Sequence, residues 1–318
     1  MRIVLLDSFP TDQGDTAWPE LRALGDLTVF PRTEPAALLA RCTGAEAVLT
    51  NKVVLSADLL AALPGLRYIG LTSTGTNVVD LKAASAHGIA VTNVPAYSTE
   101  SVAELVFAMI LHFAFRASEH DAAVKAGRWA TGLDFCFLLT PLHELHGKTL
   151  VICGLGAIGR AVARIAAAFG MSVIPAAVPG STSQDRMPLP QALPLADIVT
   201  LHCPLEPETR GLVNREFLGA LKPGAILINT SRGPIVDEPA LLEALRAGRL
   251  GGVGLDVLER EPPAREHPLL DPAAPWAGRL LVTPHMGWGT CEARRRLAVE
   301  VAQNLAAFLA GERRNRVD

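Results

Sequence analysis

Short apolar runs alternate with helical patterns along almost the whole chain, and this alternation limits the possible folds more than any other feature. Gly or Pro marks many of the boundaries between them, as at Gly44, Pro64 and Gly88. The first series of apolar runs covers residues 3–6, 27–30, 47–50, 68–71 and 90–92. Strands that alternate with helices pair in parallel, so the pattern predicts a doubly wound α/β sheet.

A second series of apolar runs begins after Lys148. It covers residues 149–153, 172–174, 198–201, 225–229, 253–257 and 280–283. These runs predict a second doubly wound sheet, a Rossmann-type cofactor domain, beside a flavodoxin-like first domain. Long amphipathic segments flank the second series at 99–116 and 292–309. They would carry the chain out of the first domain and back into it. We therefore expect a discontinuous substrate domain (1–97 and 286–318), a cofactor domain (98–285) and a cleft between them.

Composition excludes several classes of protein. The 318 residues suffice for about two domains. Lys and Arg total 29 against 32 for Asp and Glu, without the basic excess expected of a nucleic-acid-binding protein. The longest apolar segment, 102–114, contains Glu104 and His112, so we expect no membrane span. The five cysteines are scattered and form no CxxC motif, which argues against a disulfide framework or a metal site. We expect a cytoplasmic protein.

A glycine-rich loop follows the first strand of the second series. Gly154, Gly156 and Gly159 form a GxGxxG pattern between an apolar strand and an amphipathic helix. Gly154 allows a tight turn, Gly156 lets the backbone approach a pyrophosphate, and Gly159 lets the helix pack on the strand. The free N–H groups at the helix N-terminus favour phosphate. This context predicts a dinucleotide site.

The residue that normally selects the cofactor is absent. An acid about 20 residues after the glycines should bind the adenine ribose, but the second strand ends in Ala177 and Val178. The nearest cation is Arg186, although Ser181, Thr182 and Ser183 could donate hydrogen bonds to a 2′-phosphate. We favour NAD(H), with NADP(H) as the alternative.

Polar residues follow several predicted strands of the cofactor domain, at the edge where ligands bind in open parallel sheets. Arg232, Glu261 and His285 together supply a guanidinium for a carboxylate, and an imidazole oriented by a carboxylate for proton transfer. Each of these residues, taken alone, would more often have a structural role than a catalytic one. His202 competes for the acid–base role, but no matching carboxylate is evident for it.

The ordered set of motifs resembles the D-isomer-specific 2-hydroxyacid dehydrogenase family over nearly the whole chain. The motifs are GLGAIG at 154–159, HCPL at 202–205, NTSRGPIVD at 229–237, GLDV at 254–257, EP at 261–262 and TPH at 283–285. The resemblance implies hydride transfer between a nicotinamide dinucleotide and a small 2-keto or D-2-hydroxy acid. It also implies a homodimer formed through the cofactor domain.

The resemblance assigns roles residue by residue. Arg232 would bind the substrate carboxylate and carbonyl, and His285, paired with Glu261, would be the proton donor in reduction. Asp256 would hold the nicotinamide carboxamide. Further cofactor contacts are implied for Ala157, Ile158, Cys203, Thr230, Ser231, Arg232, His285 and Gly287. The sequence STGTN at 73–77, with Thr74 and Gly75, matches the family's loop for the substrate carboxylate.

Further stretches are similar to the bacterial glycerate dehydrogenases, also called hydroxypyruvate reductases. They are LTNK at 49–52, NVPAYST at 93–99, DFCF at 134–137, and Trp288. Lys52 could add a cation for the carboxylate and Trp288 could line the pocket, but a surface Lys and a packing Trp are equally compatible with the sequence. Hydroxypyruvate and glyoxylate are the favoured substrates. Residues 129–146 are interpreted either as a loop packed on their own domain or as an arm that reaches a partner subunit.

Other functions remain open at this point. A dinucleotide-sensing scaffold of the same fold, such as a transcriptional corepressor, can retain the Arg–Glu–His set. Formate dehydrogenase is disfavoured because Glu261 stands where we would expect Gln. Phosphoglycerate dehydrogenase is disfavoured because a substrate phosphate would need more cations near the pocket.

Overall fold

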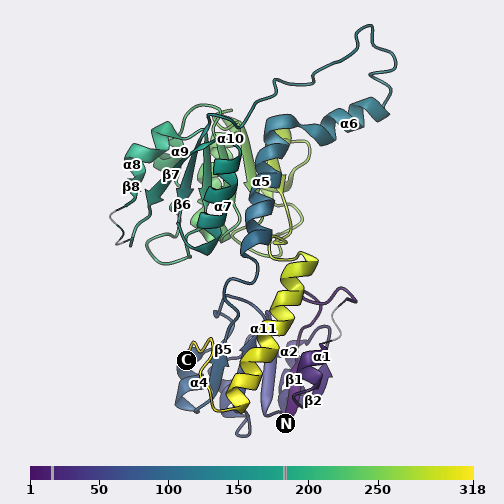
Figure 1. The fold of residues 1–318 in the computed structure, drawn as a ribbon, viewed down its shortest axis with the longest axis vertical. Coiled ribbons are helices and arrows are strands. Elements are labelled where there is room, and N and C mark those ends of the chain that lie inside the picture. The colour runs from purple at the N-terminus through teal and green to yellow at the C-terminus, as the bar shows by residue number, and fades with distance from the viewer. Residues whose placement is uncertain (16–17, 182, 184) are drawn as a thin grey trace. The chain divides into compact units, whose positions relative to one another are not determined.

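The computed structural model describes residues 1–15, 18–181, 183 and 185–318, which fall into two compact units (Figure 1). Unit 1 comprises Met1–Ser98 and Trp288–Asp318, and unit 2 comprises Thr99–Gly287. The sequence analysis placed the second division before Met286. The structure keeps Met286 and Gly287 in unit 2, where their backbone N–H groups donate to the Asp256 carboxylate.

Unit 1 is built on a parallel sheet with the strand order β2-β1-β3-β4-β5. Its strands are β1 (Arg2–Leu5), β2 (Asp26–Val29), β3 (Ala47–Thr50), β4 (Tyr68–Leu71) and β5 (Ala90–Thr92). Side chains along a strand alternate between the two faces of the sheet, so Ile3 and Leu5 enter one core and Val4 the other. The predicted doubly wound α/β sheet is confirmed.

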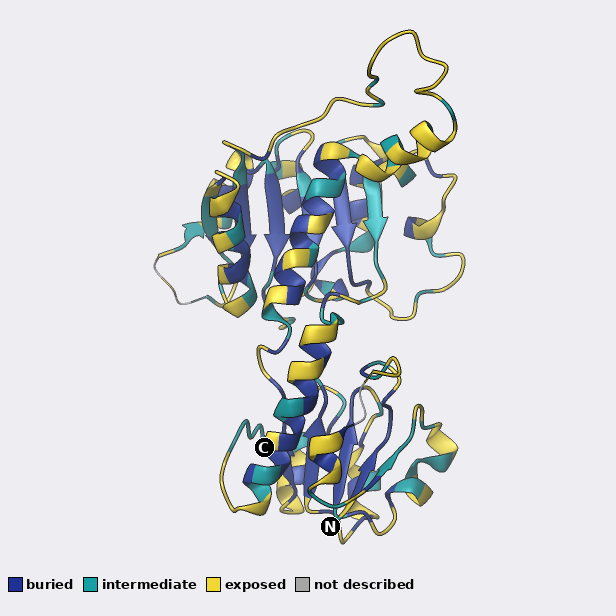
Figure 2. Cartoon of the chain, turned by 45° about the vertical axis from the view of Figure 1, so that its right-hand side comes forward, coloured by how far each residue is buried: buried dark blue, intermediate teal, exposed yellow. Residues whose placement is uncertain are grey.

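Helices cover both faces of this sheet. They are α1 (Pro19–Arg22), α2 (Pro35–Cys42), α3 (Ala57–Ala61), α4 (Leu81–Ala86) and α11 (Cys291–Leu309). α11 brings the end of the chain back onto unit 1, where it packs against β4 and α1. Ala293, Leu297, Val301 and Leu305 recur at helical spacing and form its buried side, while the opposite side is exposed (Figure 2). Thr290 caps the helix by accepting the N–H of Ala293.

Unit 2 contains a parallel sheet with the order β12-β11-β10-β9-β6-β7-β8. Its strands are β6 (Thr149–Cys153), β7 (Ser172–Ala177), β8 (Met187–Pro188), β9 (Ile198–Leu201), β10 (Ile226–Asn229), β11 (Gly252–Leu255) and β12 (Leu280–Val282). The described part of unit 2 therefore has one strand more than predicted, because β8 has only two residues and leaves no periodic pattern. Pro175 fits within β7 because β8 pairs only with Ala176 and Ala177, which leaves the outer side of Pro175 unpaired.

The helices of unit 2 again form two layers. They are α5 (Thr99–Phe115), α6 (Ala117–Lys125), α7 (Ala157–Ala168), α8 (Leu189–Ala192), α9 (Arg215–Ala220) and α10 (Glu238–Arg246). Residues of α5 and α7 share a core with Leu150 and Ile152, whereas α8, α9 and α10 share the other core with Val151 and Cys153. Among the described residues no single helix could cross a membrane. The pair α5 and α6, bent by 55°, meets the length and composition criteria only when taken together.

The chain between α6 and β6 makes a long excursion from the body of unit 2 (Figure 1). Residues 133–146 contain no helix or strand, and Leu133 and Phe135 are 103% and 89% exposed. The Trp129 indole donates to the Phe135 carbonyl at 3.0 Å, and Phe137 lies over His120 with ring centroids 6.0 Å apart. This excursion thus presents large apolar side chains to solvent in the single chain.

Candidate active site

The loops after the strands of unit 2 carry most of the predicted site residues. Arg232 follows β10, Glu261 follows β11 and His285 follows β12, and these three strands are neighbours in the sheet. Gly154 follows β6 and His202 follows β9. Because all these strands are parallel, their carboxyl ends lie along one edge, where doubly wound sheets bind ligands.

Glu261 and His285 form a direct pair. The His285 Nδ1 atom lies 2.6 Å from Glu261 Oε2, and the other carboxylate oxygen accepts the N–H of Leu258 at 3.1 Å. A carboxylate accepts hydrogen bonds, so Nδ1 carries the proton and donates it. This fixes the tautomer and leaves Nε2 as the atom that can gain or release a proton. The side chains of His285 and Glu261 are 27% and 35% exposed.

Asp256 holds the turn on which His285 lies. Its carboxylate is 2% exposed and accepts the N–H groups of Met286 and Gly287 at 2.8 Å and the Thr283 hydroxyl at 2.6 Å. The His285 N–H also donates to the Asp256 carbonyl, at 2.8 Å. His285 itself has a φ of 53°, in the left-handed region that is costly for a residue with a side chain. Both carboxylate oxygens of Asp256 therefore already bind protein donors.

A buried amide shapes the loop that carries Arg232. Asn229 accepts the N–H of Ser231 and donates to the carbonyl of Arg232, both at 3.0 Å. Ser231 Oγ donates to the Cys203 carbonyl at 2.5 Å, which joins this loop to the one after β9. The Arg232 side chain is exposed, and its Nη1 donates to the carbonyl of Ser231. The guanidinium is thus held from its own loop and is accessible.

Gly233 brings the Arg232 loop against the loop that carries Glu261. A Cβ added at Gly233 would lie 1.9 Å from the Leu258 carbonyl oxygen and 2.5 Å from the Glu259 nitrogen. No side chain fits at such a distance, so only glycine permits this backbone contact. The structure thus joins the loops of Arg232 and Glu261 and pairs Glu261 with His285.

His202, the competing acid–base candidate, is in an unsuitable environment. Burial lowers the pKa of its imidazole to about 4. Its Nε2 is buried and has no hydrogen-bond partner among the described residues. At neutral pH this imidazole is therefore uncharged, which suits a proton donor poorly.

The glycine-rich loop has the geometry that a dinucleotide requires. Gly154 has a φ of 104°, and a Cβ there would lie 2.5 Å from the nitrogen of Cys203. A Cβ at Gly159 would lie 2.2 Å from the Gly154 carbonyl oxygen, which explains the glycine at the start of α7. At Gly156, the N-cap residue of α7, a Cβ would meet nothing within 4 Å. The first N–H groups of α7, including those of Ala157 and Ile158, therefore adjoin open space, and the site fits a pyrophosphate.

The end of β7 shows a contact that sequence reasoning did not foresee. Ala177 and Val178 supply no charge, but Arg186 folds back so that its Nη1 lies 3.2 Å from Ser181 Oγ. Thr182, another of the three candidate hydroxyls, lies outside the described residues. The cation that seemed distant in sequence is therefore beside the turn after β7.

Unit 1 holds the remaining predicted substrate residues in loops after β3 and β4. Lys52 is exposed, and its loop is fixed by Asp7, whose carboxylate accepts the N–H groups of Asn51 and Lys52 at 2.7 and 2.6 Å. Burial raises the pKa of Asp7, although these backbone donors act in the opposite direction. Thr74 is exposed, and its hydroxyl donates to the Val94 carbonyl. Ser73 Oγ donates to the Gly75 carbonyl at 2.9 Å.

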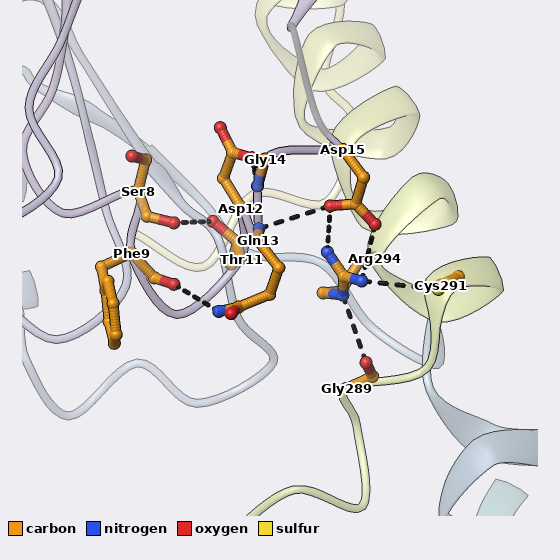
Figure 3. Close-up of polar contacts among 10 residues, drawn as sticks. All are labelled: Ser8, Phe9, Thr11, Asp12, Gln13, Gly14, Asp15, Gly289, Cys291 and Arg294. Atoms are coloured by element: carbon orange, nitrogen blue, oxygen red, sulfur yellow. Dashed lines mark hydrogen bonds and ion pairs between the residues drawn. The ribbon is translucent and has the colours of Figure 1, made fainter.

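Trp288 is half-buried against the core that α11 shares with the sheet of unit 1. The next residue, Gly289, accepts a hydrogen bond from Arg294 Nε at 3.2 Å, and the same guanidinium binds both carboxylate oxygens of Asp15 (Figure 3). Arg294 is 6% exposed, and it ties the loop after β1 to the segment that carries Trp288.

Sequence reasoning missed the anchors of these loops in unit 1. Asp7 stands two residues beyond β1, where it signals a site, but its partners lie more than 40 residues away. The pair of Asp15 and Arg294 leaves no local sequence signal at all. Among the described residues no group of three His, Cys, Asp or Glu side chains is placed to hold a metal ion.

Comparisons with known proteins agree with this geometry. Residues 107–287 match the family described as D-isomer specific 2-hydroxyacid dehydrogenase, NAD binding domain. A hydroxypyruvate reductase from Blautia hydrogenotrophica is 37% identical over 98% of each chain. A glycerate dehydrogenase from Methylorubrum extorquens is 40% identical over 89% of each chain.

A solved structure extends the likeness to the fold of both units. The D-lactate dehydrogenase of Aquifex aeolicus, complexed with NAD and lactic acid, superposes with a TM-score of 0.81 at 30% identity. The match covers 97% of this chain and 96% of that one. With the profile match over residues 107–287 and the near-full-length relatives, the chain belongs to the D-isomer-specific 2-hydroxyacid dehydrogenase family.

Proposed function

We propose that this chain reduces a small 2-keto acid to its D-2-hydroxy acid with a nicotinamide dinucleotide, and that hydroxypyruvate and glyoxylate are its substrates. The observation that carries the proposal is the 2.6 Å contact between His285 Nδ1 and Glu261 Oε2. D-Glycerate and glycolate are the corresponding products. The hydroxypyruvate reductase and glycerate dehydrogenase relatives support this choice of substrate.

His285 moves the proton of the reaction. A bound nicotinamide would supply the hydride that reduces the substrate carbonyl. Negative charge grows on the carbonyl oxygen during reduction, and the His285 imidazolium donates its Nε2 proton to that oxygen. Glu261 stabilises the imidazolium through Nδ1 and keeps the ring oriented. In the oxidative direction the neutral imidazole accepts the proton from the hydroxyl.

The substrate is held by its carboxylate. Arg232 presents a planar guanidinium that can donate two parallel hydrogen bonds to a carboxylate. In unit 1, Lys52 supplies a second cation and the loop of Thr74 and Gly75 supplies backbone N–H groups. The exposure of Arg232, Lys52 and Thr74 supports these roles. Trp288 contributes an apolar wall.

The dinucleotide binds along the loops of unit 2. Gly154, Gly156, Ala157, Ile158 and Gly159 would hold its pyrophosphate, and the open space at Gly156 supports this placement. Further contacts come from Cys203, Thr230, Ser231, Arg232, Asp256, His285 and Gly287. We propose NAD(H) as the cofactor, in line with the NAD complex of the Aquifex relative. NADP(H) is the second candidate, because the contact of Arg186 with Ser181 places a cation beside the turn after β7.

The exposed excursion of unit 2 is the arm of a homodimer in this proposal. Its apolar side chains, including Leu133, Phe135 and Leu138, are more exposed than side chains of their size normally are in a monomer. Replacing Leu133 and Phe135 with Ser together should convert a dimer into a monomer, as measured by light scattering coupled to size-exclusion chromatography. A monomeric wild type would contradict the arm.

All five cysteines are free thiols in the structure, which supports a cytoplasmic location.

Steady-state oxidation of NADH and NADPH with a panel of 2-keto acids tests the function. We expect turnover of hydroxypyruvate and glyoxylate with a higher kcat/KM than for pyruvate or for a bulky keto acid. The ratio of kcat/KM for the two cofactors decides between NAD(H) and NADP(H). Tight binding of the dinucleotide without turnover of any keto acid would instead support a sensing scaffold.

A further inference from the structure

The loop between β11 and β12 carries Glu261 and contains only two short 3-10 helices, Pro268–Leu270 and Ala277–Arg279, so the position of Glu261 needs an anchor. We propose that Glu238 and His267 form a positioning pair that holds this loop and thereby presents the Glu261 carboxylate to His285. The inference rests on the proposed function, because it assigns these two residues to the same proton-transfer step. Neither of them is placed among the groups that contact the substrate.

One carboxylate binds the loop on both sides of Glu261. Glu238 begins α10, and its Oε1 accepts the N–H of Glu259 at 2.9 Å, two residues before Glu261. Its Oε2 lies 3.0 Å from His267 Nε2, six residues after Glu261. The side chains of Glu238 and His267 are only 14% and 16% exposed, so this pair is more buried than the pair of Glu261 and His285.

Both ring nitrogens of His267 form hydrogen bonds. Its Nδ1 accepts the N–H of Leu269 at 3.3 Å and so caps the short 3-10 helix Pro268–Leu270. Because Nδ1 accepts, the ring proton is on Nε2 and is donated to Glu238. An imidazole in this tautomer needs an acceptor at Nε2, and among the described residues the carboxylate of Glu238 fills that role.

The contacts pass from Glu238 to the proposed catalytic pair in three steps. Glu238 fixes the Glu259 N–H, and the peptide between Leu258 and Glu259 packs against Gly233 with no room for a Cβ. The adjacent N–H of Leu258 donates to Glu261 Oε1, which leaves Oε2 for His285. A shift of this peptide therefore moves the donor that orients the Glu261 carboxylate.

Substitutions at both members of the pair test the inference. In Glu238→Gln the amide oxygen can accept one N–H group, but the amide nitrogen cannot accept a second, so one of the two contacts with the loop is lost. His267→Asn is the milder variant, because asparagine can still cap the 3-10 helix while the contact with Glu238 is lost. Glu243→Gln is the matched control. It lies on the same helix, and its partner is the exposed Arg215.

The expected result is a loss in kcat for hydroxypyruvate reduction of roughly tenfold to a hundredfold in Glu238→Gln, as for other small misplacements of catalytic groups. The loss in His267→Asn should be smaller, KM should change by less than about twofold, and Glu243→Gln should match the wild type. The alkaline limb of the pH–rate profile should move to lower pH in both pair variants, because a displaced carboxylate stabilises the His285 imidazolium less. A merely structural pair would lower the thermal midpoint and leave this profile in place.

A double-mutant cycle with Glu261→Gln completes the test. If Glu238 acts through Glu261, Glu238→Gln should cause no further loss of kcat in the Glu261→Gln background. An equal loss in both backgrounds, or a wild-type kcat and pH profile in Glu238→Gln, would overturn the inference. If Glu238→Gln unfolds below the assay temperature, His267→Asn takes its place in the cycle with the same criteria. Absence of turnover by the wild type would refute the proposed function, and the positioning role with it.

Discussion

Both units use a buried aspartate to hold a loop at the end of a strand, but the two loops carry different functional groups. In each, a buried aspartate just beyond a strand accepts backbone N–H groups from a neighbouring loop: Asp7 after β1 in unit 1, and Asp256 after β11 in unit 2. The loop held by Asp256 carries His285, a side chain that can exchange a proton. The loop held by Asp7 carries Lys52, an exposed amine side chain.

This difference assigns separate tasks to the two units. The strand-end loops of unit 2 carry an imidazole paired with a carboxylate, and a guanidinium on a neighbouring loop, and in the proposed function these groups act on the substrate carbonyl. Those of unit 1 carry Lys52 and the loop of Thr74 and Gly75, which in the proposed function bind the substrate carboxylate. Substitutions in the two units should therefore affect different kinetic constants, mainly kcat for unit 2 and mainly KM for unit 1.

The largest effect should come from His285. His285→Ala removes the proton donor of unit 2 and should lower kcat for hydroxypyruvate reduction by roughly 10²–10⁴-fold, the usual contribution of general acid catalysis. His202→Gln serves as the control, because that imidazole is already neutral at the assay pH. A His285→Ala enzyme with the wild-type kcat would remove His285 from the chemical step.

The next effect concerns stability. Burial lowers the pKa of His202 from 6.5 to about 4, so the unfolded chain takes up a proton below pH 6.5 while the folded chain does not until about pH 4. The free energy of unfolding should therefore fall as the pH decreases through this window, by about 3 kcal/mol over its full width. Denaturant melts of the wild type and His202→Gln at pH 7 and pH 4.5 measure it.

The variant His202→Gln should lose less stability than the wild type between these two pH values. His87→Gln is the control, because His87 is exposed and its removal should leave the pH dependence unchanged. Equal acid losses in the wild type and His202→Gln would show that the imidazole of His202 titrates normally.

Arg232→Lys should have a smaller effect than the loss of His285. Lysine keeps the charge but cannot donate two parallel hydrogen bonds, so kcat/KM should fall by roughly tenfold to a hundredfold. The matched substitution Arg215→Lys breaks an exposed bidentate pair with Glu243 on the same unit and should leave kcat/KM unchanged. Steady-state kinetics of both variants measure these effects. A kcat/KM for Arg232→Lys equal to that of the wild type would refute the guanidinium role.

The smallest effect should come from unit 1. In Asp7→Asn the single amide oxygen cannot accept both N–H groups of the Lys52 loop, so KM should rise by roughly three- to tenfold with kcat preserved. Asp80→Asn is the control, because asparagine caps a helix as well as aspartate does. A fall in kcat at constant KM would contradict the division of tasks between the units.

The sequence was sufficient to predict both parallel sheets and the pairing of Glu261 with His285. Buried strands such as 47–50 and 149–153 have a continuous apolar signature, and each motif residue follows such a strand. Parallel pairing brings strand ends to one edge, so residues distant in sequence could be predicted to meet. The strand β8 was not predicted, because two residues are too few to show a periodic pattern of apolar side chains.

The anchors of the loops could not be predicted because they depend on tertiary contacts. Glu238 and His267 are 29 residues apart, and each alone resembles an ordinary surface residue in the sequence. Arg186 lies close in sequence to Ser181, but nothing in the sequence indicates that its side chain folds back onto that hydroxyl. Such contacts follow from loop conformation, and no periodic pattern specifies loop conformation.

The most direct test of the central claim is the pH–rate profile of hydroxypyruvate reduction by Glu261→Gln beside that of the wild type. The account predicts a lower kcat and an alkaline limb displaced to lower pH, because an amide does not stabilise an imidazolium as a carboxylate does. Two superimposable profiles would show that the carboxylate next to His285 has no part in the proton transfer.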